Sequence, residues 1–142
     1  MTLDRVRADV LEELAGSRYL RLTTFRRDGQ PVHTVVWHVV AEEILYVHTG
    51  DQTGKAKRLR ANGRAEIAVS DGRGKTIGVP IVASGSTLNG QDPQRLDEAF
   101  RTKYGMQYRA VRLTEPIRRG KIGEPSFFQF TIDQVGSPQA EH

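Results

Sequence analysis

The segment "YLRLTTFRRDGQPVHTVVWHVV" (residues 19–40) decides the fold, because it holds two strand-forming runs separated by a tight-turn signal. The first run, Tyr19–Phe25, is rich in Tyr, Leu, Thr and Phe, which favour strands. Asp28-Gly29 then supplies a dipeptide that readily adopts the positive φ angles of a hairpin. The return run, Val32–Val40, has β-branched residues on both faces and predicts a strand buried on two sides. We therefore expect an antiparallel sheet to begin here.

Further strands follow this hairpin. Strand composition and turn residues predict strands at Ile44–Thr49, at Ala65–Ser70 and, with bends, at Ile77–Leu88. A basic, irregular segment is expected at residues 112–125. The last strand, at residues 126–132, is predicted because three apolar residues alternate there with polar ones, namely Phe128, Phe130 and Ile132.

Helix signals stand between these strands. Residues 1–16 carry an apolar stripe at a 3.6-residue period and predict an N-terminal helix. A helix of about two turns is expected after Asp51 or Thr53, since either side chain can cap it. Residues 92–104 form the best-marked helix, with Asp92-Pro93 at its start and a glycine after its end.

The order of these elements predicts the fold class. Many short strands with hairpin signals and few helices do not suit repeated strand-helix-strand winding. We expect one domain over residues 1–142, mostly β (α+β), built as an antiparallel barrel or curled sheet with a few flanking helices. The tail at residues 136–142 is expected to be frayed.

Composition and charge exclude several classes of function. Lys and Arg number 21 against 17 Asp and Glu, and the formal charge of +4 is mild for a dedicated nucleic-acid binder. The chain has no cysteine, so disulfides and thiolate metal sites are excluded. Its start lacks the apolar stretch of a signal peptide, and no run approaches the length of a membrane span. We therefore expect a cytoplasmic protein.

A basic cluster is the main candidate for a binding site. It lies within residues 55–64, contains no acid, and comprises Lys55, Lys57, Arg58, Arg60 and Arg64. Such a cluster can solvate a helix, bind nucleic acid or hold a phosphate. Thr53-Gly54-Lys55 would stand at the first turn of the predicted helix, where free N–H groups and the helix dipole favour an anion. Aromatic residues for base stacking are missing from the cluster, so a phosphate is favoured over nucleic acid.

No catalytic or metal-binding constellation can be read from residue spacing. His33 and His38 are five residues apart along a strand and would point to opposite faces, so we expect no metal site. The sequence indicates a phosphate-binding site but no identifiable nucleophile. This combination suits an enzyme in which a bound organic cofactor carries out the chemistry. No catalytic residue is assigned. Trp37, the only tryptophan, is either a core residue or a wall for a flat ring.

The order of three motifs resembles a known family. These are "LTTFRRDGQPVHTVVWHV" (residues 22–39), "ILYVHTGDQTGKAKRLRANGRAEIAVSDGRG" (44–74), and "GSTL" (85–88) followed by an Asp-Pro helix ending in "KYG" (103–105). Together they resemble the pyridoxamine 5'-phosphate oxidase-like family, and within it the class that binds the deazaflavin coenzyme F420. The resemblance implies an antiparallel split β-barrel of the FMN-binding type, assembled as a homodimer with cofactor sites at the subunit interface.

The resemblance also implies which residues contact the cofactor. A Ser/Thr-x-Lys segment and nearby basic residues hold the cofactor phosphate in that family, which here correspond to Thr53, Gly54, Lys55, Lys57 and Arg58. The family's Pro-Val-Trp strand lies along the ring system and corresponds to Val35, Val36 and Trp37, with Val35 in place of the proline. Arg73 in "DGRG" matches a position that often carries Arg and is expected to approach the cofactor.

These implications define the expected function. The resemblance implies an oxidoreductase that binds F420 and transfers a hydride to a small unsaturated or quinone-like molecule. FMN is the alternative cofactor, because both cofactors present a phosphate after a ribityl chain. A third possibility is a protein that binds F420 or a flavin without catalysis. The carboxyl-terminal segment lacks the Arg-rich stretch that pyridoxamine phosphate oxidases use, which disfavours pyridoxamine phosphate as the substrate.

Overall fold

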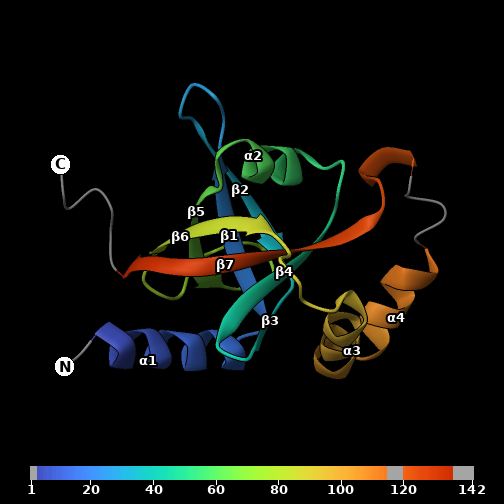
Figure 1. The fold of residues 1–142 in the computed structure, drawn as a ribbon, viewed down its shortest axis with the longest axis horizontal. Helices are drawn as coiled ribbons and strands as arrows, with labels where there is room; N and C mark the ends of the chain where they lie inside the picture. Colours follow the sequence, from blue (N-terminus) through green and yellow to red (C-terminus); the bar gives the residue numbers. More distant parts are fainter. Residues whose placement is uncertain (1–2, 115–119, 136–142) are drawn as a thin grey trace.

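The computed structural model describes residues 3–114 and 120–135. Within these residues seven strands form one antiparallel sheet in the order β2-β1-β5-β6-β7-β4-β3, which curls into a half-closed barrel (Figure 1). The strands are β1 (Tyr19–Phe25), β2 (Pro31–Val36), β3 (His38–Ala41), β4 (Ile44–Gly50), β5 (Arg64–Ser70), β6 (Ile81–Thr87) and β7 (Pro125–Val135). The helices flank this sheet and are α1 (Leu3–Gly16), α2 (Gly54–Asn62), α3 (Pro93–Tyr104) and α4 (Met106–Leu113). The predicted mostly β, split-barrel fold is confirmed.

The hairpin predicted around Asp28-Gly29 is present, but its second strand differs from the prediction. β1 pairs with β2 from Leu20↔Val36 to Phe25↔Pro31. The expected single strand over residues 32–40 is interrupted at Trp37, and β3 pairs with β4 instead. β2 and β3 stand at opposite edges of the sheet, and β2 alternates between exposed and partly buried residues. The prediction of one strand buried on both faces was therefore wrong, because β-branched residues mark a strand without showing which edge of the sheet it occupies.

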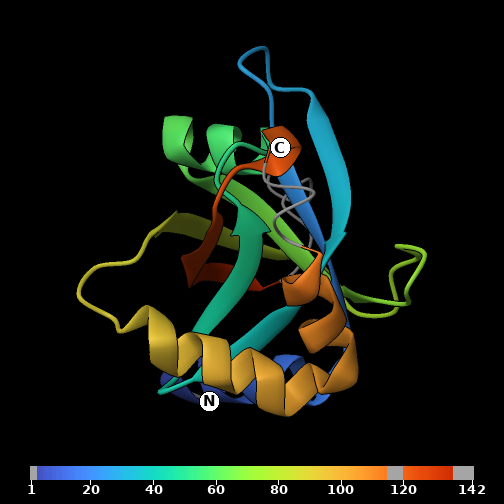
Figure 2. The same ribbon diagram turned by 90° about the vertical axis from the view of Figure 1, so that its right-hand side faces the viewer.

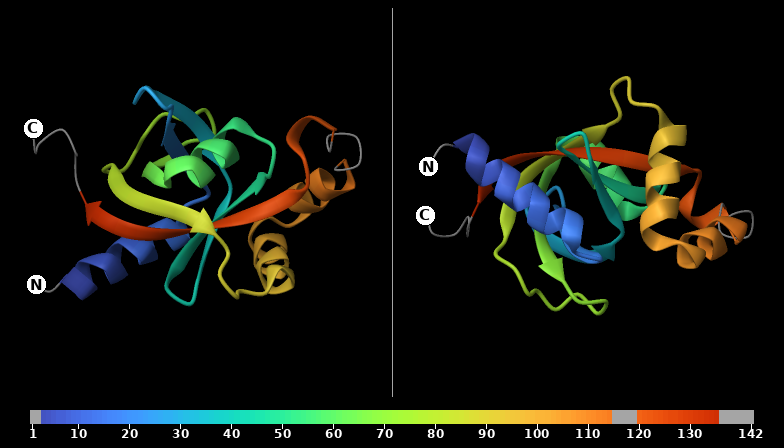
Figure 3. Two further views of the ribbon diagram at one scale, coloured as in Figure 1. Left: turned by 45° about the horizontal axis from the view of Figure 1, so that its top comes forward. Right: turned by 90° about the horizontal axis from the view of Figure 1, so that it is seen from below.

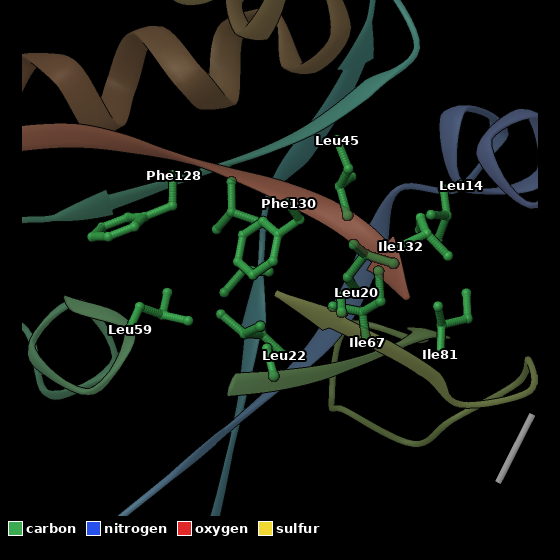
Figure 4. Close-up of a cluster of buried hydrophobic side chains, with 14 of the residues drawn as sticks. Leu14, Leu20, Leu22, Leu45, Leu59, Ile67, Ile81, Phe128, Phe130 and Ile132 are labelled. Atoms are coloured by element: carbon green, nitrogen blue, oxygen red, sulfur yellow. The ribbon is translucent and has the colours of Figure 1, made fainter. Parts of the chain in front are cut away.

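The core lies inside the curl of the sheet. Figure 4 shows its side chains converging from β1, β5 and β7, with Leu14 of α1 and Leu59 of α2 closing the two ends. The alternation predicted for the last strand is confirmed, since Phe128, Phe130 and Ile132 are all buried. Burying each such side chain contributes about 1.5 to 3 kcal/mol. Gly85 of β6 is needed beside this core, because a Cβ there would stand 2.6 Å from Cε1 of the Phe130 ring.

A second buried cluster joins α3 and α4 to the outer side of β3, β4 and β7. It contains Val39, Tyr46, Leu96, Phe100, Tyr104, Tyr108 and Phe127. The predicted helix over residues 92–104 is confirmed, with the Asp92 carboxylate accepting the Gln94 N–H at 3.0 Å. α4 was not predicted. It begins directly after Gly105, whose φ of 58° breaks the chain direction, and its burial depends on Tyr108 entering the cluster.

The remaining predictions concern the chain ends and β6. The N-terminal helix is present as α1, which crosses beneath the sheet (Figure 3). β6 begins at Ile81 rather than at residue 77, and its pairing with β7 shifts register between Val82 and Ala83, in keeping with the predicted bulge. The tail predicted to be frayed, 136–142, lies outside the described residues. Among the helices of residues 3–114 and 120–135, none is long and apolar enough to cross a membrane.

Candidate functional site

A cavity of about 300 Å³ is lined by residues of α2 and α4, among others. Figure 2 shows α2 above and α3 and α4 below in this view of the ribbon. The cavity is formed where the chain passes from β2 to β3, next to the end of β4 and the beginnings of α2 and β7. Its lining is Val35, Val36, Trp37, His48, Thr49, Gly50, Thr53, Lys55, Val111, Arg112, Ile122, Gly123 and Pro125. The described lining residues include cations and apolar side chains but no Asp or Glu, so their chemistry favours a partly apolar anion.

The first turn of α2 has the features that could hold an anion. Thr53 caps the helix, as predicted, with its hydroxyl accepting the Ala56 N–H at 3.3 Å and donating to the Gly50 carbonyl at 2.9 Å. The first N–H groups of any helix have no carbonyl partner within that helix, which leaves those of Gly54 and Lys55 available. The hydroxyl of Thr53 itself is engaged in capping. Its contribution is therefore to fix the orientation of the free N–H groups.

Positive charge is concentrated around this first turn. The guanidinium of Arg58 lies over Gly54, where an added Cβ would be 2.8 Å from its Nη1, and its Nε donates to the Thr24 hydroxyl at 2.7 Å. Burial and the neighbouring Arg58 lower the pKa of Lys55. Burial and Arg26 likewise lower the pKa of Arg58. Within the described part of the chain these cations form no ion pair with an acid, so a bound anion would relieve their mutual repulsion.

The apolar wall of the cavity is held rigid from behind. The Trp37 ring stacks on Tyr104, with ring centroids 4.7 Å apart and planes 13° from parallel. The Tyr104 hydroxyl accepts the His38 N–H at 2.9 Å and lies 2.9 Å from the Arg18 carbonyl. Burial raises the pKa of Tyr104 to about 12, so its hydroxyl remains a hydrogen-bond donor. Trp37 is therefore clamped at the point where β2 ends and β3 begins.

The opposite wall is fixed to the α2 loop by backbone hydrogen bonds. The Asp51 N–H donates to the Glu124 carbonyl at 2.8 Å, and the Gln52 N–H donates to the Ile122 carbonyl at 2.8 Å. Gly50 has no room for a side chain there, because a Cβ would meet the backbone of Ile122. The chain segment before β7 and the start of α2 thus form one unit around the cavity.

The predicted site residues divide into three groups. Those that line the cavity together are Val35, Val36, Trp37, Thr53 and Lys55. Gly54 and Arg58 do not line it but lie beside Lys55 at the first turn of α2. Lys57 is exposed on α2, and Arg73 is exposed in the turn after β5, where its N–H donates to the Asp71 carboxylate at 2.9 Å. Neither of these two reaches the cavity of this chain.

Several lining residues were not predicted. Val111 and Arg112 belong to the unpredicted α4, and Ile122, Gly123 and Pro125 lie in the segment expected to be irregular. His48 and Thr49 lie at the end of β4, shortly before the predicted phosphate segment that begins at Thr53, and could have been included on that ground. Among the described residues, no group of three or more His, Asp or Glu side chains is arranged to hold a metal ion.

The curled antiparallel sheet and the cavity beside its β2–β3 junction define a split β-barrel protein. A family profile described as pyridoxamine 5'-phosphate oxidase matches residues 6–137. The chain therefore belongs to the pyridoxamine 5'-phosphate oxidase family, as the resemblance predicted. Its place in the F420-binding class within that family stays a prediction.

Solved structures share this fold at low sequence identity. The conserved hypothetical protein Rv2991 from Mycobacterium tuberculosis is 19% identical, with a TM-score of 0.65 over 96% of this chain and 83% of that chain. A FAD-binding protein from Mesorhizobium loti is 21% identical, with a TM-score of 0.59 over 90% and 88%. HutZ, the heme storage protein from Vibrio cholerae, is 14% identical, with a TM-score of 0.58 over 96% and 92%. None of the curated proteins compared with the chain matched it.

Proposed function

We propose that the protein is an oxidoreductase that binds coenzyme F420 in this cavity and reduces a small unsaturated or quinone-like molecule. The observation that carries the proposal is the juxtaposition, in one cavity whose described lining contains no acid, of the cationic start of α2 and the apolar strand end Val35–Trp37. A flat ring system attached to a phosphate needs both features at once. Family membership supports the same class of ligand, and the choice of F420 rests on the motif resemblance.

The residues of the chain have distinct tasks in this proposal. The N–H groups of Gly54 and Lys55, together with the Lys55 ammonium and Arg58, bind the phosphate. Val35, Val36 and Trp37 provide a dry, flat wall for the ring. When bound, the reduced cofactor supplies a hydride to the acceptor, which takes a proton from solvent, so that one double bond is reduced by two electrons. The protein itself binds the cofactor, orients it toward the acceptor and excludes water from the site.

A homodimer completes the proposed site. Val35 is 36% exposed, and Ile77 and Val79, in the segment before β6, are 73% and 60% exposed. Ile77 is attached to β5 by its N–H, which donates to the Val69 carbonyl at 2.8 Å, and Gly74 lies against the Val35 side chain. Exposed apolar residues gathered beside a ligand cavity favour a protein interface. A second copy placed there would cover the outer face of β2, and Arg73 on the same segment would then be near the interface.

Two alternatives follow from the comparisons. FMN is the alternative cofactor, favoured by the relative from Mesorhizobium loti that is described as FAD-binding. A non-catalytic F420 or flavin binder is favoured by the relative described as a heme storage protein, since the same fold there is associated with storage. A return of the visible absorbance of the oxidised cofactor, when protein loaded with reduced cofactor is mixed with quinone and enone acceptors, separates the enzyme from the binder.

Binding is tested by titrating the protein with F420 and with FMN while following the fluorescence of Trp37, the only tryptophan. Lys55→Ala should weaken binding by about 1.5 to 3 kcal/mol, or about tenfold to a hundredfold in Kd, because it removes a charged hydrogen-bond partner of the phosphate. The matched control is Arg60→Ala, an exposed cation in the last turn of the same helix.

The outcomes separate the proposals clearly. Saturable quenching by F420 but not FMN supports the F420 proposal, and the reverse supports the FMN alternative. If Lys55→Ala and Arg60→Ala both leave the cofactor affinity unchanged, the basic cluster is a solvated helix surface and not a phosphate site. No saturable binding of either cofactor at micromolar concentration would refute the proposed function.

A further inference from the structure

A second cavity, of about 530 Å³, lies between the β3–β4 turn and the start of α3. Its walls come from the end of β3, the beginning of β4, the loop at residues 89–92 and the first turn of α3. In Figure 2 this loop, drawn in yellow, swings outward before α3 begins. The described linings of the two cavities have no residue in common, so this cavity is separate from the proposed cofactor site.

The floor of the second cavity carries a buried hydroxyl without a partner. Tyr46 of β4 lines the cavity although the residue is only 3% exposed. Within residues 3–114 and 120–135 its hydroxyl makes no hydrogen bond, whereas the hydroxyls of Tyr104 and Tyr108 in the same buried cluster are both bonded. Buried tyrosine hydroxyls normally find a partner. An unpaired hydroxyl at the floor of a cavity therefore indicates a ligand atom that can form a hydrogen bond there.

The sides of this cavity are apolar and fixed in place. Leu96 of α3 is buried, and Ile44 of β4 packs against the same cluster, so an apolar ligand body would contact both. The loop before α3 is tied to the sheet through Gln91. Its side chain accepts the Asn89 N–H at 2.6 Å and donates to the Gln129 side chain of β7 at 2.5 Å. The cavity is thus formed before any ligand enters it.

The rim of this cavity is negatively charged. Its described lining includes the carboxylates of Glu42 and Asp92 against the single guanidinium of Arg95. Arg95 and Glu42 lie 3.9 Å apart, beyond hydrogen-bond distance, and their side chains are 76% and 79% exposed. Such an exposed pair contributes little to stability, so a ligand can replace it at low cost. Two carboxylates against one guanidinium favour a cationic group at the rim.

We infer that this second cavity binds a small organic amine whose apolar body ends in a hydroxyl or carbonyl oxygen. The ammonium group stays at the rim beside Glu42 and Asp92. The body lies against Ile44 and Leu96, and the terminal oxygen forms a hydrogen bond with the Tyr46 hydroxyl. The inference does not depend on the proposed cofactor function, because it uses none of the residues of that site.

The first test measures the hydrogen bond to Tyr46 by isothermal titration calorimetry of the full chain. The probes are tyramine and phenethylamine, which differ only in the terminal hydroxyl. Wild-type protein should bind tyramine at least about fivefold more tightly, the ratio expected of one neutral hydrogen bond. Tyr46→Phe should bring this ratio close to one. The matched control is Tyr19→Phe, a tyrosine of β1 that does not line the cavity and should keep the ratio.

The second test measures the preference for a cation. Its probe is 3-(4-hydroxyphenyl)propionate, which carries the phenol of tyramine but a carboxylate in place of the ammonium. Wild-type protein should bind tyramine about threefold or more tightly than this anion. Glu42→Gln should reduce the preference, whereas Glu43→Gln, in the same turn but outside the cavity lining, should leave it nearly unchanged. An equal loss in both variants, or tighter binding of the anion by the wild type, would overturn the assignment of an amine.

The stability of Tyr46→Phe gives a readout that needs no ligand. Because the substitution removes an oxygen without a partner, the midpoint of urea unfolding should stay the same or rise. A lower midpoint would show that the hydroxyl is bonded within the protein and would overturn the inference. Equal binding of tyramine and phenethylamine by the wild type, a ratio that Tyr46→Phe retains, or no binding of any probe at millimolar concentration would do the same.

Discussion

The buried side chain of His38 should make the stability of this protein fall steeply in mild acid. His38 is fully buried at the start of β3, where its Nε2 lies 2.7 Å from the Leu14 carbonyl. A carbonyl can only accept, so Nε2 carries the proton of the neutral ring and donates it. The other ring nitrogen, Nδ1, is buried with no hydrogen-bond partner among the described residues. Protonating it would place an unpaired N–H and a positive charge inside the protein.

The surroundings of His38 oppose that charge. Burial and the neighbouring ammonium of Lys103 lower the pKa of His38 from 6.5 to about 4, and the bond to Leu14 offsets only part of this. The ammonium of Lys103 donates to the His38 carbonyl at 2.8 Å and lies 3.2 Å from Nε2. Burial also lowers the pKa of Lys103 itself, to about 8, so Lys103 is still mainly protonated when His38 would titrate.

The sign and size of the effect follow from proton linkage. Between the folded and unfolded pKa values the unfolded chain binds a proton that the folded protein excludes, so the free energy of unfolding falls as pH falls. With values of about 4 and 6.5, His38 should cost about 2 kcal/mol of stability between pH 7.5 and pH 5. Above pH 7.5 it should have almost no effect, because the ring is then neutral in both states.

Urea unfolding at pH 7.5, 6 and 5 measures this quantity. The comparison is His38→Gln, whose amide N–H can still donate to the Leu14 carbonyl but cannot titrate. Other groups titrate equally in both proteins, so the difference between the two pH dependences isolates His38. The variant should lose about 2 kcal/mol less stability than the wild type over this range. Parallel pH profiles for the two proteins would show that His38 is not the titrating group and would refute the reasoning.

Two further predictions concern the β3–β4 turn and the proposed dimer. Glu43, like Glu42, has a positive φ in the two-residue turn after β3, so Glu43→Gly should raise the free energy of unfolding by roughly 0.5 to 1 kcal/mol in urea denaturation. The control Glu12→Gly, at an exposed position of α1, should lower the free energy of unfolding. If Glu43→Gly also lowers it, the turn assignment is contradicted. Ile77→Asp should shift the mass measured by light scattering from two chains to one, whereas an unchanged mass, or a monomeric wild type, would contradict the proposed interface.

Local signals in the sequence determined most of the secondary structure. Asp28-Gly29 needs only its own backbone preferences to make a hairpin, and Thr53 and Asp92 cap their helices through contacts within three residues. The alternation of Phe128, Phe130 and Ile132 places one face of β7 in the core without reference to any other strand. The helix start at Thr53–Lys55, where we propose that a phosphate binds, is local in the same sense, which is why the sequence predicted its place at the first turn of α2.

Tertiary structure decided the rest of the site. The break at Trp37, which sends β2 and β3 to opposite edges of the sheet, depends on pairing with β4 and on the Tyr104 ring, 67 residues further along the chain. α4 is stabilised where Tyr108 enters a cluster of distant residues, which is what brings Arg112 to the cavity. The sequence also did not show which cations face the cavity. Lys55 and Lys57 are the same residue type two positions apart, and only the packing of α2 on the sheet distinguishes them. Contacts between distant segments leave no mark on the residues nearby, so the α2 side of the cavity was predictable from the sequence and the α4 side was not.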